Sequence, residues 1–175
     1  MWVGLYDINH WVMVSYLESA PNIAWLFLPA GVRLILIMVF EDKSLLGLFL
    51  GAMTTGWIFN DLNLSLGLII IISLIATLAP YLAYRVVKRF KFELRGDLRN
   101  LNLDTIVSLA LSAALLSTLG HHLVFKLNEG IFGVQWLASV LTFFVGDLIG
   151  TLMILMLVFV AFKLWHTHIR GVLRG

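Results

Sequence analysis

The chain has 175 residues, of which 61% are hydrophobic and only 13% are charged, and its formal net charge is +2. A soluble domain carries about 25% charged residues, and one this small leaves too much surface in water to hide so much apolar area. The composition therefore excludes an ordinary soluble enzyme and predicts an all-α, polytopic integral membrane helix bundle. A membrane-spanning helix needs about 20 residues, so we expect five or six spans and no separate soluble domain.

The first 22 residues interrupt apolar side chains with polar ones, among them Asp7, His10 and Glu18. An N-terminal helix lying at the membrane interface fits this mixture, and a marginal sixth span fits it as well. No Lys or Arg occurs before Glu18, whereas a signal peptide begins with a basic region. We therefore expect this segment to belong to the mature protein.

Five apolar segments follow and make up the predicted bundle of residues 23–162. The predicted spans are residues 23–40, 45–59, 64–84, 105–125 and 136–162. The last is longer than a bilayer requires, so it should tilt or project beyond the membrane. A long charged connection precedes the fourth span, and residues 163–175 form a basic tail.

The positive charges predict the orientation. Ten basic residues fall in alternate connections and the tail, whereas Lys126 alone falls on the other side and Arg33 lies inside a span. The ten are Lys43, Arg85, Lys88, Arg89, Lys91, Arg95, Arg99, Lys163, Arg170 and Arg174. Because cytoplasmic loops carry the excess of Lys and Arg, the connection 85–104 and the C-terminus are expected in the cytoplasm. This topology explains the basic loop without nucleic acid and indicates membrane lipids as its neighbours.

Arg33 and Asp147 lie deep within the first and last spans, each about 15 Å from the predicted outer boundary. A charge at that depth costs about 2.5–3.5 kcal/mol on insertion scales, so it normally faces the bundle interior and finds a partner. We expect the two to pair directly or to share a small polar cavity. The pair either fixes helix register or forms a site for a ligand, ion or proton.

Pro29 and Gly31 precede Arg33 and predict a kink in the first span beside this site. Backbone carbonyls freed by such a break can line a cavity. Gly146 stands next to Asp147 in the last span, which places it in the same candidate ligand-binding group.

Small residues at helical spacing predict packing faces. Gly47 with Gly51, and Gly146 with Gly150, have the spacing of four that lets helix backbones approach closely. In the fourth span, Ala110, Ala114 and Ser117 share one stripe. We expect packing within the chain, with a homo-oligomer contact as the alternative.

No catalytic constellation, cofactor motif or metal-binding motif stands out, and there is no cysteine to form a disulfide or a thiolate site. His121 and His122 are adjacent and diverge on a helix, so we interpret them as interfacial residues at a helix end. The tryptophans fit belts at the two membrane boundaries. The sequence therefore favours a protein that is not an enzyme.

The motifs Trp25…Pro29-Ala30-Gly31, Gly47…Gly51-Ala52 and Gly146-Asp147…Gly150 resemble, in order and spacing, the MASE1 family of bacterial membrane sensory domains. Members usually have about eight spans and continue into a cytoplasmic output module, whereas we expect five or six spans and no output module here. The resemblance implies a bacterial inner-membrane bundle with a sensor-like function, centred on Pro29, Gly31, Gly146 and Asp147.

Two main functions remain open. A stand-alone MASE1-like domain would bind a small ligand and act through a separate partner. A non-catalytic accessory subunit would pack against a larger respiratory, photosynthetic or transport complex. A third alternative, a small transporter subunit, requires a solvent-accessible central cavity.

Overall fold

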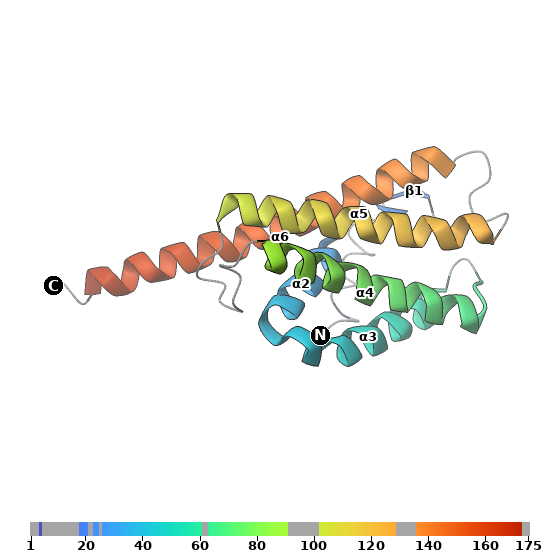
Figure 1. Ribbon diagram of the computed structural model, residues 1–175, viewed down its shortest axis with the longest axis horizontal. Helices are drawn as coiled ribbons and strands as arrows, with labels where there is room; N and C mark the ends of the chain where they lie inside the picture. Colours follow the sequence, from blue (N-terminus) through green and yellow to red (C-terminus); the bar gives the residue numbers. More distant parts are fainter. Residues whose placement is uncertain are drawn as a thin grey trace.

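The computed structural model describes Gly4 and residues 18–20, 23–24, 26–60, 63–90, 102–128 and 136–172. Most of these residues are helical, with one short pair of strands before the helices, which confirms the predicted all-α class (Figure 1). The elements are β1 (Glu18–Ala20), β2 (Ile23–Ala24), α2 (Leu28–Phe40), the 3-10 helix η1 (Glu41–Ser44), α3 (Leu45–Ile58), α4 (Leu66–Phe90), α5 (Leu103–Leu127) and α6 (Trp136–Val172).

Three helices are long and apolar enough to cross a membrane, namely α4, α5 and the part of α6 from Trp136 to Leu164. The 13 residues of α2 and the 14 of α3 make shorter helices. At about 1.5 Å per residue, α3 is about 21 Å long, less than the roughly 30 Å of a bilayer core. The structure therefore supports a membrane protein, while the predicted count of five or six spans is not confirmed.

The first predicted span differs from the structure at its beginning. It was expected to start at residue 23 with a kink at Pro29, but Ile23–Ala24 is a strand that pairs with Glu18–Ala20, and α2 begins at Leu28. Pro29 lies in the first helical turn, where its missing N–H leaves no hydrogen bond unmade and its fixed φ suits the helix. Proline thus starts this helix instead of bending one.

Most of the N-terminal segment predicted as an interfacial helix or sixth span lies outside the described residues. Its last part, Glu18–Ala20, is the strand β1. The side chains of residues 165–172 also lie outside the described part, although α6 continues as a helix to Val172 and so includes much of the predicted basic tail. That end of α6 projects well beyond the other helices (Figure 1).

The core fills the space among α2, α4, α5 and α6. Its fully buried side chains include Leu34, Ile37, Tyr84, Leu109 and Leu155. The outer surface is apolar as well, and α5 exposes a large hydrophobic side chain at every fourth position. These residues are Leu103, Val107, Leu111, Leu115, Leu119, Leu123 and Leu127. A water-soluble protein rarely exposes such an extended apolar row, so the surface fits a lipid environment.

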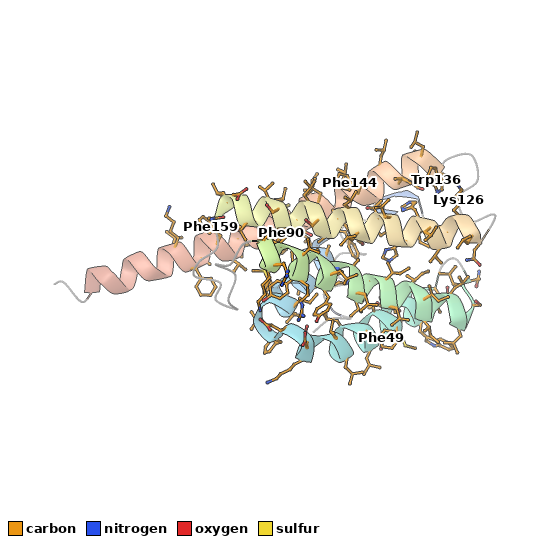
Figure 2. All side chains as sticks on the ribbon, viewed as in Figure 1. Phe49, Phe90, Lys126, Trp136, Phe144 and Phe159 are labelled. Atoms are coloured by element: carbon orange, nitrogen blue, oxygen red, sulfur yellow. The ribbon has the colours of Figure 1, made fainter. Side chains whose placement is uncertain are left out.

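Opposite ends of the bundle carry different polar groups. Lys126 lies over the ring of Trp136 at the end where α5 meets α6 (Figure 2). At the other end, η1 turns back beside the last turns of α4. There Glu41 pairs with Lys88 and accepts a hydrogen bond from the Tyr84 hydroxyl at 2.9 Å. These contacts fasten the turn between α2 and α3 to α4.

Glu41 makes this fastening dependent on pH. Its hydrogen bond with Lys88, and then that with Tyr84, lower the pKa of its carboxyl below the ordinary value of 4.5. A group whose pKa is lower in the folded state contributes stability above its unfolded pKa and loses it as the pH falls through the folded value. We expect the melting temperature of the wild type to exceed that of Glu41→Gln near about pH 7, and the difference to shrink below about pH 4.5.

The measurement is thermal unfolding in detergent across this pH range. Lys43→Gln is the matched control, because Lys43 is an exposed charge in the same turn. A difference between wild type and Glu41→Gln that is independent of pH would contradict the role of the ionised carboxyl.

Candidate functional site

A cavity of about 140 Å³ lies within the helix bundle and receives side chains from every helix from α2 to α6. Both intramembrane charges predicted from the sequence, Arg33 and Asp147, line it. The remaining lining residues are Phe27, Ala52, Thr55, Gly56, Phe59, Asn60, Leu64, Ile69, Ile72, Ser73, Ala76, His121, Phe125 and Phe143. The wall is thus largely apolar with a few polar groups, which is the usual character of a small-molecule site.

The cavity exists because two helices are shorter than their neighbours. The backbone N–H of Phe27, just before α2, donates a hydrogen bond of 3.1 Å to the carbonyl of Gly146, which lies well inside α6. Helix α2 therefore begins part of the way along α6. Helix α3 ends at Ile58. The Asn60 side-chain amide then donates a hydrogen bond to the Leu64 carbonyl and accepts one from the Leu64 N–H. The cavity lies between the start of α2 and the end of α3.

Arg33 is held in the cavity wall by contacts from two elements. Its side chain is 8% exposed and its guanidinium carbon lies 5.5 Å from the centre of the Phe27 ring. It also donates a long hydrogen bond of 3.5 Å to the carbonyl of Ala76 in α4. That carbonyl lies four residues before Pro80, which has no N–H with which to close the helical hydrogen bond. Pro80 thus leaves the Ala76 carbonyl able to accept the hydrogen bond from Arg33.

Asp147 is 5% exposed and faces Arg33 and Ser117. Its carboxyl is hydrogen-bonded to the Ser117 side chain, and the charge of Arg33 acts on it electrostatically. Among the described residues, the ion pairs are Glu41 with Lys88 and Asp42 with Arg85. Arg33 and Asp147 therefore line the same cavity without forming a direct salt bridge with each other. Of the two predicted arrangements, the structure has the shared cavity.

His121 is the member of the site that the sequence analysis missed. It was interpreted as interfacial, but it is 5% exposed and lines the cavity. Its Nδ1 lies 2.8 Å from the carbonyl of Ser117. Because a carbonyl only accepts, Nδ1 must carry the proton, and a neutral ring then presents Nε2 as an acceptor. Within the part of the chain that the structure describes, Nε2 has no hydrogen-bond partner.

His122 is also buried, although it was expected at an interface. Its Nδ1 contacts the carbonyl of Thr118, and its Nε2 lies 3.3 Å from the Ser139 hydroxyl in α6. It packs edge-on against Trp136 and does not line the cavity. Both histidine rings lie beside Phe143, with ring centres 4.9 Å and 5.4 Å away, but only His121 lines the cavity.

The predicted glycines of α2 and α6 meet at one contact. A Cβ at Gly150 would overlap the backbone carbonyl of Phe27, and a Cβ at Gly31 would lie 2.6 Å from that of Ile154. Gly146 accepts the hydrogen bond from Phe27. Gly31, Gly146 and Gly150 therefore let the first turns of α2 lie directly on α6, which places Arg33 near Asp147. Pro29 is fully buried at the same contact.

The other predicted packing residues separate into two groups. Ala110, Ala114 and Ser117 are buried on the face of α5 inside the bundle. A Cβ at Gly47 would meet nothing within 4 Å, so no close packing occurs there among the described residues. The carbonyl of Gly51 accepts a hydrogen bond from the Thr55 side chain at 3.1 Å. Two glycines four residues apart therefore mark a close helix contact in α6, at Gly146 and Gly150, but not in α3 at Gly47.

Among the described residues, no group of three His, Asp or Glu side chains is arranged to hold a metal ion. Comparison with protein-family models, with curated proteins and with solved structures gave no match. The resemblance to MASE1 domains therefore stays a prediction from short motifs, and the cavity is the feature of the structure that bears on function.

Proposed function

We propose that this chain is a membrane-embedded sensory domain that binds a small ligand in the cavity and acts through a separate partner protein. The observation that supports this proposal is the convergence of Arg33, His121 and Asp147 on one cavity inside an otherwise apolar bundle. Two buried charges that only fixed helix register would need neither a cavity beside them nor a third polar group. The motif resemblance to MASE1 domains supports the same proposal.

We further propose that α2 and α3 complete a five-span topology despite their length. Non-helical residues lie beside both short helices, since Ile23–Ala24 is a strand before α2 and residues 63–65, between α3 and α4, are not helical. Non-helical backbone at membrane depth is tolerated where it lines a cavity or is buried in protein. Positive-inside bias would place η1 and the end of α6 in the cytoplasm of a bacterial inner membrane.

Cysteine labelling tests this orientation directly, because the chain has no native cysteine. We expect Lys126→Cys to react with a membrane-impermeant maleimide in intact cells. Lys43→Cys should react only after permeabilisation, because η1 would face the cytoplasm. Both positions are exposed, so accessibility should depend on the side of the membrane alone. Labelling of Lys43→Cys in intact cells would contradict the topology.

Ligand binding is tested by a thermal-shift screen of small polar compounds on the protein purified in detergent. Compounds that bind in the cavity should raise the melting temperature of the wild type. They should not affect Ala52→Leu, because Ala52 lines the cavity from α3 and a larger side chain would fill it. Thr54→Leu, on the exposed side of the same helix, is the control and should keep the response. A response that survives in Ala52→Leu, or no response to any compound, would contradict the proposal.

An accessory subunit is the second candidate, and a separate surface groove favours it. The groove lies between α3 and α4, has a volume of about 280 Å³ and is mainly apolar. Its lining residues are Leu50, Met53, Thr54, Trp57, Leu66 and Ile69. Trp57 is exposed there, so its ring is available to pack against a helix of a partner protein. A complex that co-purifies with the wild type and is lost in Trp57→Ala, but not in Ala52→Leu, would support this candidate.

A further inference from the structure

The two halves of the bundle are filled differently. The half that ends at η1 contains the hydrophobic core, whose side chains come mainly from the second halves of α2 and α4 and the first halves of α3 and α5. Four of these side chains have no exposed surface, namely Leu34, Ile37, Ile106 and Leu109. The η1 half of the bundle is therefore closed by packed apolar side chains.

The cavity lies in the opposite half, at the end where Lys126 contacts Trp136 (Figure 2). Its lining comes from the start of α2, the second half of α3, the first half of α4, the last turns of α5 and the first part of α6. The same five helices thus surround a packed core in one half and a cavity in the other.

The cavity is elongated along the helices. Ala52, Gly56 and Phe59 line it at helical spacing, which gives a length of about 10 Å along α3. Asn60 and Leu64, which form the turn after α3, line it as well. Both are half-buried, so this end of the cavity lies at the surface of the protein.

Close contacts between helices form side walls of the cavity. A Cβ at Gly56 would lie 3.1 Å from the Ile69 side chain, so α3 and α4 touch there. A Cβ at Gly120 would lie 2.6 Å from the Ile75 side chain, so α4 and α5 touch as well. These contacts favour the end at Asn60, and not a gap between these helices, as the entrance.

Polar side chains line the cavity from this entrance to its inner part. Asn60 lies at the entrance, and Thr55 lies more than one turn deeper on α3. His121 contacts the ring of Phe143, and Asp147 lies one turn further along α6. A solute that leaves water loses hydrogen bonds unless it finds new partners. Polar groups at successive depths therefore suit a solute that enters from water, whereas a lipid tail would gain nothing from them.

We infer that the entrance at Asn60 and Leu64 admits a small water-soluble solute from the outer side of the membrane, and that the packed η1 half prevents its passage into the cytoplasm. This inference rests on the proposed ligand-binding function and on the proposed orientation, in which η1 faces the cytoplasm. The ligand class is then a solute of the outer compartment, and not a molecule dissolved in the bilayer or the cytoplasm. A closed inner half also argues against the transporter alternative.

Single cysteines test the entrance, because the chain has no cysteine of its own. Ser73→Cys and Thr77→Cys are a matched pair one turn apart on α4. Both side chains are buried, with 2% and 3% exposed, but of the two Ser73 lines the cavity. Right-side-out and inside-out membrane vesicles are treated with impermeant methanethiosulfonates, one cationic and one anionic. Thiols that have not reacted are then measured after denaturation by a gel shift with polyethylene glycol maleimide.

In right-side-out vesicles, Ser73→Cys should react at least about tenfold faster than Thr77→Cys with one or both reagents, because the thiolate that reacts forms only where water reaches the sulfur. In inside-out vesicles, Ser73→Cys should react as slowly as Thr77→Cys. If Ser73→Cys does not fold, Thr55→Cys on the α3 wall of the cavity takes its place.

Faster reaction of Ser73→Cys in inside-out vesicles, or equal rates for the pair in both kinds of vesicle, would overturn the inference. Modification of Ser73→Cys by a lipid-soluble maleimide alone would show entry from the bilayer and would overturn the water-soluble class. The thermal-shift screen decides separately whether the cavity binds a ligand, because it measures binding and not entry. Failure of this inference therefore leaves the proposed function intact, whereas failure of the screen does not.

Discussion

A Gly150→Ala variant should have a melting temperature about 5–10 °C below that of the wild type, which corresponds to a destabilisation of about 2–3 kcal/mol. The added methyl group would overlap the backbone carbonyl of Phe27 and would lie 3.0 Å from the backbone nitrogen of Leu28. Neither neighbour is the flexible end of a side chain, so α2 would have to move away from α6. That movement would also lengthen the hydrogen bond from Phe27 to Gly146.

Gly47→Ala is the matched control for this substitution. It adds the same methyl group to a helix, and nothing lies within 4 Å of the new atom. Alanine also favours a helix over glycine by about 1 kcal/mol, so this variant should be as stable as the wild type or slightly more stable. Thermal unfolding followed by circular dichroism in one detergent compares the two. Equal melting temperatures for Gly150→Ala and Gly47→Ala would show that α2 does not lie directly on α6.

Removing either intramembrane charge alone should destabilise the protein by about 1–3 kcal/mol, because the attraction between the two buried charges is then lost. We expect this result for Arg33→Gln and for Asp147→Asn in the absence of ligand, although Asn keeps one polar contact with Ser117. The double variant should lose at least about 1 kcal/mol less than the sum of the two single losses. Chemical denaturation in mixed micelles measures all four free energies of unfolding.

The exposed pair of Asp42 and Arg85 provides the control cycle. Their side chains are 67% and 55% exposed and their charged atoms are 3.6 Å apart. Exposed pairs are worth about 0–1 kcal/mol, so both single variants and the double variant should stay close to the wild type. Strict additivity at Arg33 and Asp147 would mean that the two charges do not interact across the cavity.

Several features of this site could be predicted from the sequence because they depend on solvation alone. Charged residues at the centre of apolar segments must face inward, and both Arg33 and Asp147 do so. The glycines that flank Asp147 predicted a close helix contact, and Gly150 makes one. The all-α class follows from the same argument, since long apolar segments in lipid must satisfy their backbone within a helix.

The start of α2 and the end of α3 could not be predicted, because local composition does not decide where an apolar segment becomes helical. Residues 23–27 are as apolar as the helix that follows, so hydropathy alone gave no sign that the chain is a strand at Ile23–Ala24. The close approach of Phe27 to Gly150 fixes the start of α2 instead, and it is a long-range contact. The length of α3 likewise depends on the turn that Asn60 closes with Leu64.

His121 had a signal that could have revealed it. The buried stripe of Ala110, Ala114 and Ser117 continues at helical spacing to residue 121, so this histidine follows the inner face of α5. Pro80 had a similar signal, since a proline inside a helix frees the carbonyl four residues earlier. For His121 the residue type suggested a helix end, whereas its helical register indicated the interior of the bundle.

One consequence follows from the unbroken course of α6. The residue that charges the cavity wall, Asp147, and the projecting end at Val172 belong to a single helix of 37 residues. The stretch between them is about 37 Å long at the usual helical rise. If α6 tilts by about 5° at the level of Asp147, Val172 moves by about 3 Å over that length. A small tilt of α6 at the level of Asp147 would therefore give a larger displacement at Val172.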